Sequence, residues 1–123
     1  MPRTIQIENS DEVMAMFGIP GHFYRGKWQN VRVTQVSPDE DTPLDVRKSL
    51  VGLIIPTILT KENIEGQTGA TLPIPENSRL AYACDVVEVL KSSGKQEAAE
   101  QLRKTVPNPL DMYVLEDGVY ELV

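Results

Sequence analysis

Histidine and cysteine are nearly absent from this chain, which has one of each, His22 and Cys84, in 123 residues. A single cysteine cannot form an internal disulfide, and an unpaired thiol is typical of a reducing compartment such as the cytoplasm. One histidine and one cysteine also cannot supply the cluster of ligands that a zinc site requires. We therefore expect no disulfide, no metal and no cofactor, and a cytoplasmic location.

Long apolar runs are missing as well. The longest extends from Leu50 to Ile55, whereas a membrane-spanning helix needs about 20 consecutive apolar residues. The start, Met1 to Thr4, is not followed by the apolar segment of a secretory signal. The net charge of −6 disfavours non-specific binding to nucleic acids and to anionic membranes. We expect a small soluble domain with no membrane partner.

Sequence signatures of catalysis are not found either. Cys84 and His22 form the only cysteine–histidine combination, and Cys84 falls on the apolar face of a predicted helix, where a thiol is normally inert. No serine lies in a Gly-x-Ser-x-Gly elbow. Gly66 to Gly69 lacks the Gly-Lys-Ser/Thr ending of a phosphate-binding loop. These absences lead us to expect a protein without catalytic activity.

The clearest structural pattern is a helical hairpin at about 79–105. Its first helix is expected to follow the capping residues Asn77 and Ser78 and to end at Gly94, which can adopt the left-handed conformation. Its second helix is expected from Lys95 to about Thr105, before two prolines. The apolar residues of the first helix recur at helical spacing and are Leu80, Ala83, Cys84, Val87 and Leu90, with Tyr82, Val86 and Val89 beside them.

This first helix is apolar over more than half of its circumference. Such a helix needs neighbours on more than one side. It therefore lies either in the middle of the fold or at a contact between subunits. The second alternative motivates the expectation that the protein is a homodimer.

Shorter segments complete the predicted fold. They are a strand at Thr4–Ile7, a short helix ending at Gly18, a hairpin across 22–36 that turns at Gly26-Lys27, a helix at about 43–53 with an extended segment near 56–59, a polar connection at 61–76, and a C-terminal hairpin around Asp117-Gly118. A strand over 49–55 is the alternative to the helix. This order predicts one domain, 1–123, of the α+β class, with a small, mainly antiparallel sheet and helices packed on one face.

The two predicted hairpins carry expectations about pairing and burial. In the C-terminal hairpin, Met112–Glu116 pairs with Val119–Val123 and the terminus is docked; its core face holds Tyr113, Leu115, Tyr120 and Leu122. In the 22–36 hairpin, His22 pairs with Val31. One face of this hairpin then holds Tyr24, Val31 and Val33, and the other holds Phe23, Arg25, Trp28, Asn30 and Arg32.

The most distinctive surface is predicted in the window from His22 to Arg32. This window holds four cationic residues, if His22 is counted, and no acid, in an otherwise acidic chain. Arginine and tryptophan are enriched at binding hot spots. The candidate residues for binding a ligand or partner are His22, Phe23, Tyr24, Arg25, Lys27, Trp28 and Arg32. The alternative is that Phe23 and Trp28 are core residues and the cations form a solvated rim.

Three functions are compatible with these patterns. The leading hypothesis is a small non-catalytic binding or adaptor protein that acts through protein–protein contacts as a homodimer. The second is a ligand-binding protein or small enzyme for a phosphate-bearing or anionic molecule, with the 61–76 connection as a lid and His22, Tyr24, Arg25 and Arg32 as candidate residues. The third is single-stranded nucleic-acid binding through the 22–36 hairpin, which the net negative charge makes the least expected partner.

Overall fold

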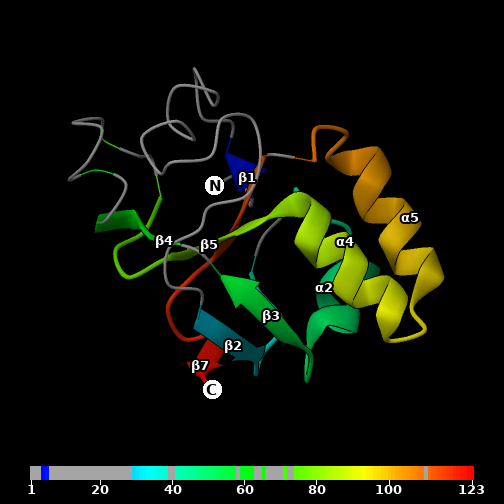
Figure 1. Ribbon diagram of the computed structural model, residues 1–123, viewed down its shortest axis with the longest axis horizontal. Coiled ribbons are helices and arrows are strands. Elements are labelled where there is room, and N and C mark those ends of the chain that lie inside the picture. The colour runs from blue at the N-terminus through cyan, green and yellow to red at the C-terminus, as the bar shows by residue number, and fades with distance from the viewer. Residues whose placement is uncertain are drawn as a thin grey trace.

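The computed structural model describes residues 4–5, 29–38, 41–57, 59–62, 65, 71, 74–109 and 111–123. Its described helices are α2 (Leu44–Leu50), α4 (Ala83–Ser92) and α5 (Gln96–Thr105). Its described strands are β1 (Thr4–Ile5), β2 (Gln29–Val33), β3 (Ile54–Thr57), β4 (Leu59–Thr60), β5 (Arg79–Tyr82), β6 (Met112–Leu115) and β7 (Tyr120–Leu122). The three helices lie together on one side of the strands (Figure 1), so the predicted α+β class is confirmed.

The described strands form two small sheets, where the sequence analysis expected one. The first sheet has the order β1-β6-β5-β4 and the second has the order β3-β2-β7. Every pairing in both sheets is antiparallel. The two sheets share one hydrophobic core, which includes Val31 and Val33 from the second sheet and Tyr113 and Leu115 from the first.

The predicted helical hairpin is confirmed as α4 and α5, but its first helix begins at Ala83 rather than near Arg79. Arg79–Tyr82 forms β5, which lies between β6 and β4. Leu80, Ala81 and Tyr82 are all buried, as expected for a strand that is covered on both faces. Ser78 Oγ donates to Pro75 O instead of capping α4. The helical spacing of Leu80 with the later residues was therefore misleading.

Helix α4 lies in the middle of the described fold. It packs against α5, β3, β5 and β6. Its buried residues are Ala83, Val86, Val87 and Leu90. The neighbours that its apolar circumference needs are therefore supplied by the chain itself, which is the first of the two alternatives that the sequence left open.

The segment predicted as a helix at 43–53 is helical at Leu44–Leu50. The alternative prediction, a strand that begins at Ser49, is therefore wrong. Pro43 is the N-cap residue of α2 rather than its first helical residue. Gly52, at φ +89°, then reverses the chain, and its N–H donates to Val33 O at 2.7 Å. This bond starts the pairing of β3 with β2. The expected extended segment is thus β3 and β4, and it begins at Ile54.

The C-terminal segment turns where predicted but does not form the predicted hairpin. Gly118 has φ +92°, and Val119 N–H donates to Glu116 O across the turn. The strands then separate, because β6 pairs with β1 and β5 whereas β7 pairs with β2. All four residues of β6 are buried. A strand that is apolar on both faces buries most surface when it lies inside a sheet and both of its faces are covered by other elements. Leu122, expected on the core face, is 58% exposed.

Residues 29–36 are the described part of the predicted 22–36 hairpin, and the first five of them form β2. Val31 and Val33 are buried and Asn30 and Arg32 are exposed, which confirms the predicted alternation. The expected pairing of Val31 with His22 is wrong, because Val31 pairs with Ile55 on one side and Leu122 on the other. The start of that hairpin, the short helix before Gly18 and most of the 61–76 connection lie outside the described residues. Among the helices that are described, none has the length and apolar character needed to cross a bilayer.

Candidate functional site

Of the predicted site residues, only Arg32 belongs to the described part of the chain. Its side chain is exposed on β2, and its Nη1 donates to Glu121 Oε1 on β7 at 3.0 Å. Because both side chains are about half exposed, this ion pair adds little to stability. The other predicted residues lie outside the described residues and are His22, Phe23, Tyr24, Arg25, Lys27 and Trp28.

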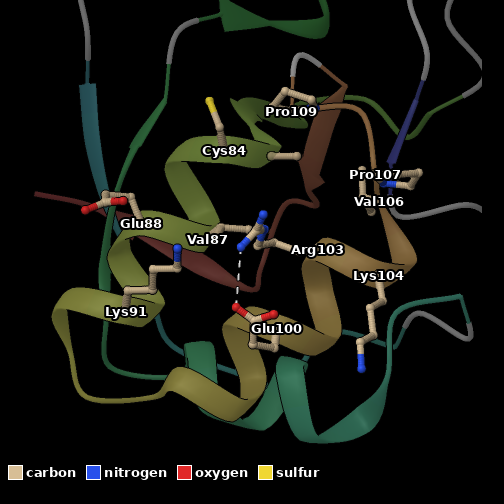
Figure 2. A pocket seen from close by; sticks show the side chains of 11 residues that line it. Cys84, Val87, Glu88, Lys91, Glu100, Arg103, Lys104, Val106, Pro107 and Pro109 are labelled. Carbon is tan, nitrogen blue, oxygen red and sulfur yellow. Dashed lines mark hydrogen bonds and ion pairs between the residues drawn. The ribbon is translucent and has the colours of Figure 1, made fainter.

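A groove of about 630 Å³ lies between α4, α5 and the segment that follows α5 (Figure 2). Its apolar floor is formed by Ala83, Val87 and Val106, which are nearly buried, and its exposed apolar lining residues are Pro107 and Pro109. Its remaining lining residues are polar or charged and are Cys84, Glu88, Lys91, Glu100, Arg103 and Lys104. We call this feature the α4–α5 groove.

Local sequence explains how the groove is built. On α4, Cys84, Glu88 and Lys91 follow one another at the spacing of a single helical face. After α5, the chain turns back so that Cys84 N–H donates to Pro109 O at 3.1 Å and Ala83 N–H donates to Asp111 O at 2.9 Å. These bonds satisfy amides of the first turn of α4 that have no partner within the helix. They also fix Pro109 at one end of the groove, beside Cys84 (Figure 2).

The rim of the α4–α5 groove carries charges of both signs. Arg103 Nη1 donates to Glu100 Oε1 at 3.4 Å on α5, and Figure 2 shows the Arg103 guanidinium between the two helices. Within the described residues, Glu88, Lys91 and Lys104 form no ion pair. The rim therefore has three cations and two acids, in a chain whose net charge is −6.

The thiol of Cys84 is half-buried at one end of the groove and forms no disulfide. Burial raises the pKa of this thiol, and the neighbouring Asp85 carboxylate raises it further. A raised pKa keeps the thiol protonated near neutral pH and makes it a weak nucleophile. Burial also raises the pKa of Asp85, whose Oδ2 has no hydrogen-bond partner in the described structure. The Cys84 thiol is thus poorly suited to act as a nucleophile in the groove.

A second polar cluster links the two sheets. Arg79 Nε donates to Thr57 Oγ1 at 3.0 Å, and Thr57 Oγ1 donates to Gln29 O at 2.6 Å. Tyr120 Oη donates to Asn77 O at 2.8 Å. These bonds satisfy polar groups at the junction, so we interpret the cluster as structural. No three histidine, cysteine or carboxylate side chains come together as a metal site in the part of the chain that is described.

Sequence reasoning did not predict the α4–α5 groove. Pro107 and Pro109 indicated only the end of a helix, and the sequence analysis assigned no role to Glu88, Lys91 and Arg103. Their convergence depends on the return of the chain to the start of α4. Comparisons with protein-family models, curated proteins and solved structures gave no significant match to this chain.

Proposed function

We propose that this chain is a small non-catalytic binding protein that contacts another polypeptide through the α4–α5 groove. The observation that carries the proposal is the combination of an apolar floor with a charged rim in one concave surface. Protein–protein interfaces have this organisation, with apolar residues at the centre, polar residues around them and arginine enriched. The raised pKa of the half-buried Cys84 thiol agrees with a binding role.

The partner segment that fits this surface is an amphipathic helix. Helices α4 and α5 have 10 residues each, which corresponds to about 15 Å of helix at 1.5 Å per residue. A third helix laid along them would place its apolar stripe on the exposed Pro107 and Pro109 and over the nearly buried Val87 and Val106, as in helix-in-groove recognition. The rim of mixed sign favours a partner helix that carries both acidic and basic side chains beside its apolar stripe.

Cys84 gives a direct test, because one substitution at this position can fill the groove and another can leave its volume unchanged. Cys84→Trp should fill the end of the groove, whereas Cys84→Ser should leave it open. Affinity enrichment from an extract of the source cells, with quantitative mass spectrometry, would identify proteins retained by the Ser variant and lost by the Trp variant. We expect the purified partner to bind the Trp variant at least ~10-fold more weakly, which corresponds to ~1.4 kcal/mol.

Two controls make this comparison decisive. Circular dichroism of both variants must match the parent chain, so that a lost interaction is not caused by unfolding. Lys48→Glu changes an exposed charge on α2, away from the groove, and should leave the affinity unchanged. A partner that bound the Trp and Ser variants equally well would show that the groove is not its binding surface.

The second candidate function is the binding of a small anionic molecule in the same groove. The volume of about 630 Å³ is within the range of small-molecule sites, and Lys91 and Lys104 form no ion pair among the described residues. A thermal-shift screen against nucleotides and other anionic metabolites tests this candidate. A stabilising compound whose effect is lost in Lys91→Ala would support it over the polypeptide partner.

A further inference from the structure

The outer edge of β7 carries backbone groups that have no partner among the described residues. In the pairing with β2, Thr34 N–H donates to Val119 O and Val123 N–H donates to Asn30 O, and Arg32 lies opposite Glu121. Hydrogen-bonded pairs alternate along an antiparallel ladder, so the backbone of Glu121 faces β2. The N–H and C=O groups of Tyr120 and Leu122 therefore point away from β2. Strand β7 is the last strand of its sheet, near the C-terminus (Figure 1).

This edge is less protected than the opposite edge of the same sheet. On β3, the residues that face outward are Ile54 and Pro56, because Val33 N–H donates to Leu53 O and the alternation continues from there. Pro56 has no N–H, and proline at an edge discourages further strand pairing. On β7, by contrast, Leu122 and Val123 are 58% and 60% exposed. An edge with free donors, free acceptors and exposed apolar side chains is complementary to another strand.

We propose that β7 pairs in antiparallel orientation with β7 of a second copy of this chain. The two-fold axis would pass between the two Glu121 residues, and Tyr120 would lie opposite Leu122 of the second copy. This register uses the outward N–H and C=O of both residues on each strand. A shift toward the turn would require a strand partner at Gly118, whose φ of +92° is not extended. The result is a continuous sheet in the order β3-β2-β7-β7-β2-β3.

Side chains support the same register. Tyr120 and Leu122 share a face with Val33 and Val31, their partners on β2. In the dimer, the half-buried Tyr120 would pack against the exposed Leu122 of the second copy, twice by symmetry. On the other face the two Glu121 carboxylates would lie opposite each other, which is unfavourable, although each is held by Arg32 at 3.0 Å. With so short a strand we expect weak association that depends on concentration.

Proline at position 122 tests the proposal directly. Because the Leu122 N–H faces outward, Leu122→Pro removes a donor of the dimer contact without removing a bond to β2. Sedimentation equilibrium from about 5 to about 500 µM should show the parent chain rise from the monomer mass of 13.7 kDa toward twice that value. We expect Leu122→Pro to remain monomeric over this range with an unchanged circular dichroism spectrum.

Two further variants test the side chains of the dimer contact separately from its backbone hydrogen bonds. Leu122→Thr keeps the N–H but replaces the apolar leucine with a smaller and more polar side chain that still favours strands, so it should dimerise more weakly than the parent but more strongly than Leu122→Pro. Glu121→Gln removes the opposed charges at the two-fold axis and should tighten association. In the parent chain, exchange of the Tyr120 and Leu122 amides with deuterium should slow as concentration rises.

The outcomes are distinguishable from those of the groove proposal, on which this inference does not rest. A parent chain that stays monomeric up to about 500 µM, or a Leu122→Pro variant that dimerises like the parent, would overturn it. So would a dimer that persists in Leu122→Pro and shields Cys84 from thiol reagents, because that dimer would use the α4–α5 groove. Dimerisation that is unchanged in Cys84→Trp and abolished in Leu122→Pro is the expected result.

Discussion

Arg47 shows how a single side chain can position a whole segment. From α2 it reaches back to the loop before the helix, where its Nη1 donates to Ser37 O at 2.7 Å and its Nε donates to Thr42 O at 2.9 Å. Ser37 and Thr42 are both buried. Buried carbonyl groups that lose their donors are costly, so this arginine connects the end of the β2 segment to the start of α2.

We expect Arg47→Met to lower the free energy of unfolding by about 2 kcal/mol, because it removes two charge-assisted hydrogen bonds and keeps most of the apolar stem. Urea denaturation followed by circular dichroism measures the change. Lys48→Met is the matched control, since Lys48 is the exposed neighbour on the same helix and should change stability by less than ~0.5 kcal/mol. Equal effects of the two substitutions would contradict the anchoring role.

Asp85 is a residue whose charge opposes folding. It lies in the first turn of α4, where the helix dipole favours an anion, yet burial raises its pKa. The folded chain therefore holds this proton more tightly than the unfolded chain does. The contribution of this group to the free energy of unfolding is fully present below the pKa of aspartate in the unfolded chain. It is lost as the pH rises from that pKa through the raised pKa of the folded chain.

Asp85→Asn should therefore stabilise the protein at pH 7 and not at pH 3, where the parent carboxyl is already protonated. Since the group is about half exposed, we expect a gain of less than ~1 kcal/mol. Thermal unfolding at the two pH values measures it. Glu97→Gln, at the exposed first turn of α5, is the matched control and should not stabilise, because its charge is favourable to the helix dipole. A stabilising effect that persisted at pH 3 would require another explanation.

At the scale of the elements, the α4–α5 connection is fixed by local chemistry. Gly94 has φ +78°, its N–H donates to Lys91 O, and Lys95 N–H donates to Leu90 O at 2.9 Å. This pair of bonds is the Schellman motif, which satisfies carbonyl groups at the end of a helix. Lys95 Nζ also donates to Ser49 O at 2.6 Å, which joins the connection to α2.

We expect Gly94→Ala to destabilise the protein by about 1 kcal/mol. The cause would be conformational strain alone, because an added Cβ would have no atom within 4 Å. Gly94→Asn should cost less than alanine, since asparagine tolerates the left-handed region better. Thermal unfolding of the two variants and of Ser93→Ala, an exposed neighbour at φ −92°, gives the comparison. An alanine variant as stable as the parent would show that the turn relaxes to another conformation.

At the scale of the whole molecule, both sheets and the three helices contribute to one core. Leu102 on α5 and Val31 on β2 are fully buried members of the same hydrophobic cluster. The Asp117-Gly118 turn passes the chain directly from one sheet to the other. Each sheet is therefore stabilised by side chains that the other also contacts, and we expect the two to unfold together.

Leu102→Ala should lower the free energy of unfolding by about 2–5 kcal/mol through the cavity it leaves, and Val31→Ala should destabilise less because fewer atoms are removed. In both variants, far-ultraviolet circular dichroism and tyrosine absorbance should report a single coincident transition. Two separate transitions in Val31→Ala would show that the three-stranded sheet melts on its own.

The periodicity of the sequence determined local conformation where neighbours in the chain decide it. The end of α4 at Gly94, the second helix up to Thr105, the helix after Pro43 and the alternation of Val31 and Val33 all follow from capping residues and from spacing. Leu80–Tyr82 was predicted wrongly because a short apolar run fits both a helix and a buried strand. For that segment the choice depends on β4 and β6, which come from distant parts of the chain.

Strand partners and the binding surfaces were decided by the tertiary structure alone. The turn at Asp117-Gly118 was recognisable, but β6 and β7 joined different sheets because burial of a fully apolar strand outweighs pairing across a short turn. Likewise, the α4–α5 groove exists because Pro109 and Asp111 accept hydrogen bonds from the start of α4. The sequence pattern shows which face of a helix or strand is apolar. Which other element packs against that face depends on how all the apolar surfaces of the folded chain are buried together.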